Sequence, residues 1–210
     1  RSTLFPYTTL FRSSYLKYGL SDMQGWRKRQ EDAHLAAVSK GEKKDIDVFG
    51  VFDGHGGKEI SKFVSNHFLD ELVANKNLPS DMSLALKETF IKMDEIMQTK
   101  EGIEEIKKYS RQSKEEDDRQ SKNEPPNSQM QLLAQLMPPK DPEANDIFMR
   151  TGCTACVMGI DETNKKIYFA NAGDSRVVLC RNGKAEEGSQ DHKPEMESEK
   201  NRIYKADGYS

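Results

Sequence analysis

The chain has 210 residues, with 32 basic and 35 acidic side chains that give a formal net charge of −3 at neutral pH. This length is enough for one substantial domain with its own hydrophobic core. No stretch approaches 18 consecutive apolar residues, which excludes a membrane-spanning helix, and a pI near 5.9 argues against a primarily nucleic-acid-binding protein. Three irregularly spaced cysteines do not make a disulfide framework, so we expect a reducing compartment, the cytoplasm or the nucleus.

The first thirteen residues, RSTLFPYTTLFRS, contain no acidic residue and show neither a strand nor a helix period. They lack the longer apolar run and the cleavage site of a secretory signal. They resemble a translated sequencing adapter, so we leave residues 1–13 out of the predicted fold. The chain does not begin with methionine, so anchoring by an N-terminal lipid cannot be tested.

Residues 14–99 are expected to form the first part of a domain from strands and two helices. Three strands are predicted, over residues 15–23, 33–38 and 46–52. Between Ile60 and Leu72, apolar residues recur at helical spacing and predict an amphipathic helix. A second helix is predicted after the next proline, with Ser80 or Asp81 as its N-cap.

The excess of charge is confined to one stretch, because 15 of the 25 residues in 100–124 are charged. Paired prolines follow, and large apolar residues are few. This composition predicts a solvated, flexible insertion over residues 100–146. The insertion is either a tolerated surface loop or a segment that docks a partner.

Residues 147–210 form the second part of the predicted domain and are rich in strands. We predict these strands over residues 153–160, 166–172 and 176–180, and Asn182-Gly183 is a strong hairpin signal after the last of them. Strands, then paired helices, then more strands indicate an α+β fold rather than a parallel βαβ sheet.

The most informative motif is DGHGG at residues 53–57, between a predicted buried strand and a predicted helix. An aspartate at the end of a strand can present its carboxylate into a cleft, and the glycines allow a ligand to approach the backbone closely. The N-terminus of the following helix favours an anion such as phosphate. Taken alone, the motif is as typical of a tight turn with a solvated histidine.

Two further motifs carry oxygen donors and a cation. Arg27 stands four residues before the pair Glu31 and Asp32, and Asp174 lies in a predicted turn between strands. Hard cations such as Mg²⁺ and Mn²⁺ take oxygen ligands, and arginine offers a bidentate fork to a phosphate. On a strand, Glu31 and Asp32 would point to opposite faces, so at most one would face a given metal. Each motif alone is also typical of a surface charge cluster or an ordinary turn.

Five motifs occur together in a fixed order: YGLSDMQGWRKRQEDAH, VFGVFDGHGG, TGCTACV, ANAGDSR and DHKP. In order and approximate spacing they resemble the type-2C, metal-dependent protein serine/threonine phosphatases. The resemblance covers about residues 17–208 apart from the charged insertion, and corresponds to the N-terminal two-thirds of that catalytic domain. It implies a pair of packed antiparallel sheets flanked by helices, an α-β-β-α sandwich, which agrees with the α+β prediction.

The resemblance also implies a site for two Mg²⁺ or Mn²⁺ ions, with a third, weaker ion in some relatives. By this resemblance Asp53 bridges the two ions, and the Gly54 carbonyl and Glu31 are further ligands. Asp32 holds a metal-bound water, and Asp174 helps to bind the third ion. A bridging water of lowered pKa then attacks phosphorus in line.

Three more roles follow from the same resemblance. Arg27 is expected to bind the substrate phosphate, and His55 to protonate the departing serine or threonine oxygen. Thr154 is expected to hydrogen-bond the metal-site aspartates. The sequence thus predicts a monomeric phosphatase that acts on phosphoproteins and binds no nucleic acid.

Alternatives remain open at this point. The family supplies two more metal-binding aspartates beyond Ser210, so we expect residues 1–210 alone to be inactive and poorly folded. Two alternatives to a protein phosphatase remain. One is a non-catalytic binding module that docks partners through the charged insertion, and the other is a phosphohydrolase that acts on small molecules. Trp26, the single tryptophan, is expected to pack rather than to bind. Cys153 and Cys156 are expected on opposite faces of a strand, which disfavours zinc.

Overall fold

The computed structural model describes residues 7–12, 16–38, 46–78, 80–121 and 147–208. Its strands are β1 (Tyr7–Arg12), β2 (Lys17–Asp22), β3 (Ala33–Ala37), β4 (Ile46–Phe52), β5 (Gly54–His55), β6 (Gly152–Cys153), β7 (Ala155–Asp161), β8 (Lys166–Ala172), β9 (Val178–Arg181) and β10 (Lys184–Glu187). Its helices are α1 (Glu59–Ala74), α2 (Met82–Met97), α3 (Lys100–Ser121) and α6 (Glu197–Lys205). None of the described helices is long and apolar enough to cross a membrane.

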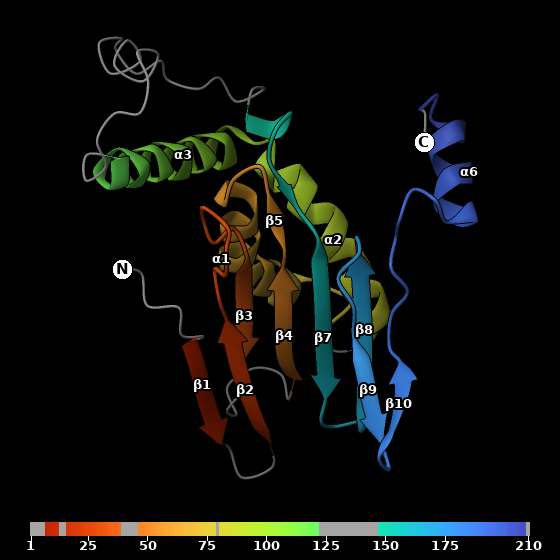
Figure 1. Cartoon of the computed structure of the whole chain (residues 1–210). Coiled ribbons are helices and arrows are strands. Elements are labelled where there is room, and N and C mark those ends of the chain that lie inside the picture. Colours follow the sequence, from red (N-terminus) through yellow and green to blue (C-terminus); the bar gives the residue numbers. More distant parts are fainter. Residues whose placement is uncertain (1–6, 13–15, 39–45, 79, 122–146, 209–210) are drawn as a thin grey trace.

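A four-stranded antiparallel sheet in the order β3-β4-β7-β8 is the centre of the fold. Helices α1 and α2 cover one face of it, with α1 against β3 and β4 and α2 against β8 (Figure 1). Residues of β4 alternate between the two faces, so that Val48 and Phe52 lie fully buried beneath the helices. The rings of Phe52 and of Phe68 on α1 lie 5.9 Å apart. Burial of this apolar face holds the helices on the sheet.

The predicted helices and strands of this region are confirmed, as is the α+β class. Helix α2 begins where expected, and the Asp81 side chain caps it by accepting a hydrogen bond from the Leu84 N–H at 3.0 Å. Asn182 and Gly183 have φ values of 51° and 77°, which the tight turn between β9 and β10 requires. On the sheet face opposite the helices, Tyr18 of β2 packs edge-on against Phe49 at 4.9 Å.

Helix α3 corrects the expectation of a solvated insertion from residue 100. Its 22 residues place Ile106 and Tyr109 in the core. Where α3 packs against α1, His67 Nε2 of α1 lies 2.9 Å from a carboxylate oxygen of Glu105 on α3. The Tyr109 hydroxyl donates to the other oxygen of that carboxylate. Described charged residues such as Glu101, Glu104 and Lys108 are exposed on the outer face of the helix, so dense charge here marks a one-sided amphipathic helix rather than a loop. Residues 122–146 of the expected insertion lie outside the described residues.

Strand β1 corrects a second expectation. Residues 7–12, within the segment left out of the predicted fold, pair antiparallel with β2 along its whole length, from Tyr7 opposite Asp22 to Arg12 opposite Lys17. The run YTTLFR is rich in aromatic and threonine residues, which favour a strand once a partner edge is available. Strand β2 supplies that edge.

Truncating a core residue of α2 is expected to destabilise the fold far more than truncating an exposed one. Leu86→Ala removes a side chain that is 2% exposed, whereas Ile91→Ala removes one on the same helix that is 55% exposed. We expect Leu86→Ala to lower the free energy of unfolding by roughly 2–5 kcal/mol and Ile91→Ala by less than about 1 kcal/mol. Urea unfolding followed by circular dichroism measures both. Equal losses would show that α2 does not pack as described.

Candidate active site

A surface pocket of about 600 Å³ lies where the loop between β2 and β3 meets the end of β4. Five of the predicted site residues line it: Arg27, Glu31, Asp32, Asp53 and Gly54. Glu31 and Asp32 precede β3 rather than lying within it. The strand alternation that would separate their side chains therefore does not apply, and both line the same pocket.

Asp53 is held in place through its backbone. Its carbonyl accepts a hydrogen bond from the Thr154 N–H at 2.9 Å, and its N–H lies 3.3 Å from Thr154 Oγ1. The Thr154 hydroxyl is also 2.6 Å from the Ser175 hydroxyl, which joins this site to the loop that carries Asp174. The Asp53 carboxylate is left exposed and available to a ligand.

Gly54 allows two distant segments to touch. A Cβ at this position would lie 2.1 Å from the Glu31 carbonyl oxygen and 2.8 Å from Ser61 Oγ. Ser61, fully buried in the first turn of α1, donates its hydroxyl to that carbonyl at 2.5 Å. Sequence reasoning missed Ser61, because nothing along the chain links a helical serine to a carbonyl 30 residues earlier.

The carboxylates of the pocket are crowded. Burial raises the pKa of Asp32 above its usual value, and the charge of Asp53 and a hydrogen bond with it raise it further, whereas Arg27 acts in the opposite direction. Two carboxylates that repel each other are stabilised in their charged forms when a divalent cation binds between them.

Donors of this kind fit a hard cation. Carboxylate oxygens and a glycine carbonyl are what Mg²⁺ and Mn²⁺ take, and the Gly54 backbone lies against Glu31 with no room for a Cβ. Among the described residues, no group of three His, Cys, Asp or Glu side chains converges closely enough to hold a metal ion. The pocket thus offers oxygen donors of the kind that a hard cation takes, without a complete set among the described residues.

His55 and Asp174 do not line this pocket. His55 is exposed on β5, which pairs with β6 so that His55 lies opposite Gly152. A Cβ on Gly152 would come within 2.8 Å of His55 Nε2, so this glycine leaves space for the imidazole. Asp174 is exposed after Gly173, whose carbonyl accepts a hydrogen bond from the His192 N–H at 2.9 Å.

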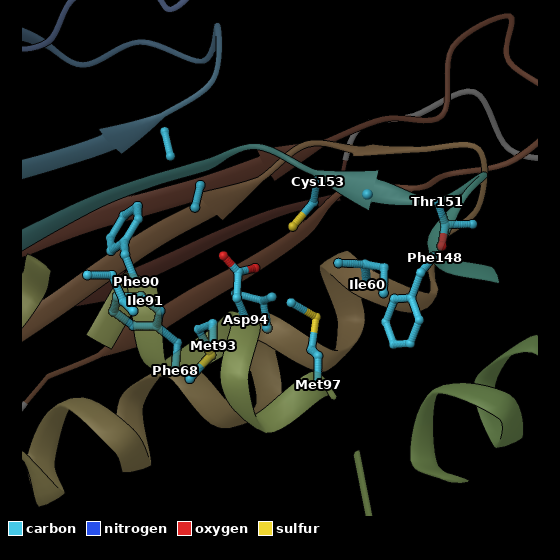
Figure 2. A pocket seen from close by; sticks show the side chains of 14 residues that line it. Ile60, Phe68, Phe90, Ile91, Met93, Asp94, Met97, Phe148, Thr151 and Cys153 are labelled. Carbon is cyan, nitrogen blue, oxygen red and sulfur yellow. The ribbon is translucent and has the colours of Figure 1, made fainter. Parts of the chain in front are cut away.

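A second cavity, of about 470 Å³, lies between helices α1 and α2 and strands β6 to β8 and is mostly apolar. Figure 2 shows Asp94 of α2 and Cys153 of β6 facing each other across it. Burial, then the charges of Asp94 and Asp53, raise the pKa of the Cys153 thiol to about 12. The thiol is therefore protonated at neutral pH and is not an activated nucleophile. All three cysteines are free.

Known proteins of one family are similar to this chain in sequence. A sequence model of the family described as "Protein phosphatase 2C" matches residues 16–107 and 96–210. "Probable protein phosphatase 2C 3" of Paramecium tetraurelia is 39% identical over 203 residues, which cover 96% of this chain and 56% of that protein. "Probable protein phosphatase 2C 21" of Arabidopsis thaliana is 37% identical over 205 residues, covering 92% of this chain and 55% of that protein.

A solved structure of a sex-determining protein of C. elegans is similar in fold. Its TM-score is 0.59 at 22% identity, and the match covers 98% of this chain and 39% of that one. This similarity concerns the fold alone. The chain spans little more than half the length of its curated relatives. With a family match along nearly all its residues and the predicted α+β architecture, the chain belongs to the protein phosphatase 2C family.

Proposed function

We propose that this chain is part of a protein phosphatase that hydrolyses phosphoserine and phosphothreonine with the help of two Mg²⁺ or Mn²⁺ ions. The observation that carries the proposal is the meeting of Arg27, Asp32 and Asp53 in one pocket with the Gly54 backbone. The guanidinium of Arg27 can bind a phosphate, and the crowded carboxylates of the same pocket can bind metal ions. This combination suits a metal-dependent reaction on a phosphate ester. The names of the relatives support a protein phosphatase.

The acidic residues of the pocket would hold the ions. Asp53 would bridge them, the Gly54 carbonyl and Glu31 would complete part of the ligand set, and Asp32 would accept a hydrogen bond from a bound water. Ions bound here would supply a water of lowered pKa as nucleophile and neutralise charge on the phosphate. Thr154, through its bonds to the Asp53 backbone, would keep the Asp53 carboxylate aimed at them. Asp174 would help to bind a weaker third ion.

Two further residues would act on the substrate itself. Arg27 would bind the phosphate through paired N–H donors, which orients it for attack. His55, exposed on β5 directly after Gly54, would give a ring proton to the departing serine or threonine oxygen. The arrangement of a phosphate-binding arginine beside metal-type ligands favours catalysis over a binding module, which has no need of that combination.

Truncating Arg27 provides one test of this proposal. In the full-length protein, Arg27→Ala is expected to raise KM for a phosphothreonine peptide about 10- to 100-fold, because a charge-assisted pair of hydrogen bonds is lost. Arg111→Ala, on α3, removes an arginine outside the pocket and serves as the control. Release of inorganic phosphate at varied peptide and Mn²⁺ concentrations measures both variants. An unchanged KM in Arg27→Ala would overturn the role proposed for it.

The same assay separates the alternatives. Hydrolysis of phosphopeptides that EDTA abolishes supports the proposal. Hydrolysis of nucleotides but not of phosphopeptides would point to a small-molecule phosphohydrolase. No turnover of either would favour a binding module. We also propose that residues 1–210 alone are inactive, since no group of three His, Cys, Asp or Glu side chains among the described residues could hold a metal ion. Phosphopeptide hydrolysis by that polypeptide would contradict this last point. Light scattering of the full-length protein tests whether it is monomeric.

A further inference from the structure

Trp26 is almost wholly in contact with solvent, with 99% of its surface exposed. The expectation that it packs is therefore wrong. It lies on the loop that forms one wall of the candidate active site, between Gln24 and Arg27, which both line the pocket. Met23, on the same loop, is 53% exposed. A large aromatic surface left in water at the rim of a pocket is typical of a contact surface for a ligand or partner.

The turn that carries Trp26 is held closed by two hydrogen bonds. The Arg27 N–H donates to the Gln24 carbonyl at 3.3 Å, and Gln24 Nε2 donates to the Arg27 carbonyl at 2.7 Å. Gly25 occupies the first central position of the turn. Its φ of 61° is the positive value that the primed types of β-turn require there, and no atom lies near its missing Cβ. The closed turn presents the indole outward while Arg27 returns to the pocket wall. Because the backbone of the turn is already ordered, its ordering does not add to the cost of binding a partner at Trp26.

The charges beside Trp26 indicate what it would contact. Arg27, Lys28 and Arg29 are consecutive, exposed and all line the pocket. A single arginine is enough for the phosphate, and the carboxylates that line the same pocket, Glu31, Asp32 and Asp53, are the groups proposed to hold the cations. Lys28 therefore provides positive charge at the rim beyond those needs. Complementary charge favours a partner with acidic residues close to its phosphate. Tryptophan and arginine are also the residue types that carry most of the binding energy at interfaces.

We propose that Met23, Trp26, Lys28 and Arg29, which we name the Trp26 rim, dock the substrate beside its phosphorylated residue. The occupant is a phosphopeptide segment with an acidic residue and an aromatic or large aliphatic side chain next to the phosphoserine or phosphothreonine. The apolar side chain packs on the indole, and the acidic side chain pairs with Lys28. This inference rests on the proposed function and adds a substrate class to it.

The test uses the full-length protein with Mn²⁺ and three phosphothreonine peptides of equal length. One peptide has glutamate and phenylalanine beside the phosphothreonine, one replaces the phenylalanine with serine, and one replaces the glutamate with glutamine. p-Nitrophenyl phosphate, which has no amino-acid side chain beside its phosphate, reports on the chemistry apart from peptide docking. We expect Trp26→Ala to lower kcat/KM about tenfold for the two phenylalanine peptides, mainly through KM. It should leave the serine peptide and p-nitrophenyl phosphate within about twofold.

Two more variants sharpen the result. In the unmodified protein, kcat/KM should be higher for the peptide with glutamate and phenylalanine than for the one with glutamine and phenylalanine. Lys28→Glu should remove this difference. Tyr204→Ala truncates an aromatic side chain that is 50% exposed on α6 and should change no rate. A second readout needs no turnover: quenching of tryptophan fluorescence by acrylamide, taken as the difference between the unmodified protein and Trp26→Phe. Binding of a non-hydrolysable phosphonate version of the first peptide should protect Trp26 from the quencher.

The outcomes separate this inference from the proposed function. If p-nitrophenyl phosphate and all peptides are hydrolysed equally well by the unmodified protein and Trp26→Ala, the docking role is overturned and the phosphatase stands. If nothing is hydrolysed, the proposed function fails, and the quenching experiment alone decides whether the Trp26 rim docks a phosphopeptide. Protection of Trp26 by the phosphonate peptide would then support docking, and its absence would overturn it.

Discussion

Asp53→Asn is expected to lower Mn²⁺-dependent hydrolysis of a phosphothreonine peptide by the full-length protein about 10³-fold or more, with the fold intact. The carboxylate is the proposed bridge between two cations, and their stabilisation of charge is worth several kcal/mol in the transition state. The contacts that hold Asp53 use its backbone N–H and carbonyl. Asparagine has the same shape and leaves those contacts in place.

A matched substitution distinguishes this effect from a general loss of charge. Asp70→Asn changes an exposed aspartate on α1 outside the pocket, and activity should stay within about twofold. Titration with Mn²⁺ followed by electron paramagnetic resonance should show weaker ion binding in Asp53→Asn only. Circular dichroism should give the same spectrum for all three proteins. Undiminished turnover in Asp53→Asn would contradict the proposed role, and a binding module would be indifferent to the change.

Gly54→Ala is expected to destabilise the protein by about 3 kcal/mol and to remove most activity, although it adds a single methyl group. The new Cβ would meet the Glu31 carbonyl at 2.1 Å, and this backbone oxygen cannot turn away as a flexible side chain could. Ser61, bonded to the same oxygen, must move as well. The segment that carries Glu31 and Asp32 would then be displaced from Asp53, which lowers metal affinity together with stability.

Gly183→Ala is the control for this substitution. Gly183 has a φ of 77° and open space around it, so alanine there carries a conformational cost of roughly 1–2 kcal/mol without a steric clash. The conformation of Gly54 is not in the left-handed region, and its cost comes from the contact alone. Urea unfolding in the presence of EDTA compares the two without a contribution from bound metal. An alanine at position 54 that costs no more than one at 183 would show that the two segments do not meet as described.

Much of the fold was predictable because its signals are local. The apolar residues of α1 recur at helical spacing, and the Asp81 cap marks the start of α2. Strand β4 is a short apolar run ended by Asp53, and Asn182-Gly183 marks a hairpin. Each of these patterns depends on neighbours in the sequence and on the period of one element.

Helix α3 was not predictable in the same way. Its charge density is typical of a solvated segment, and among its described side chains Ile106 and Tyr109 are the buried apolar ones that reveal an inner face. The contacts that stabilise it are with α1, including the pair between His67 and Glu105. Amphipathic helices of such high charge are stable mainly because tertiary packing covers their apolar face, and a one-dimensional pattern does not contain that partner.

The sequence by itself determined the family resemblance, the α+β class and five candidate site residues that line the pocket, because ordered motifs and hydrophobic periods are properties of the chain. Only the tertiary structure decided which of those residues share a pocket. It brought Arg27, Asp32 and Asp53 together, and it left His55 and Asp174 outside the lining. It also placed Trp26 in solvent and Ser61 against the Glu31 carbonyl. These outcomes depend on distances between segments far apart in the chain, and packing in three dimensions sets those distances.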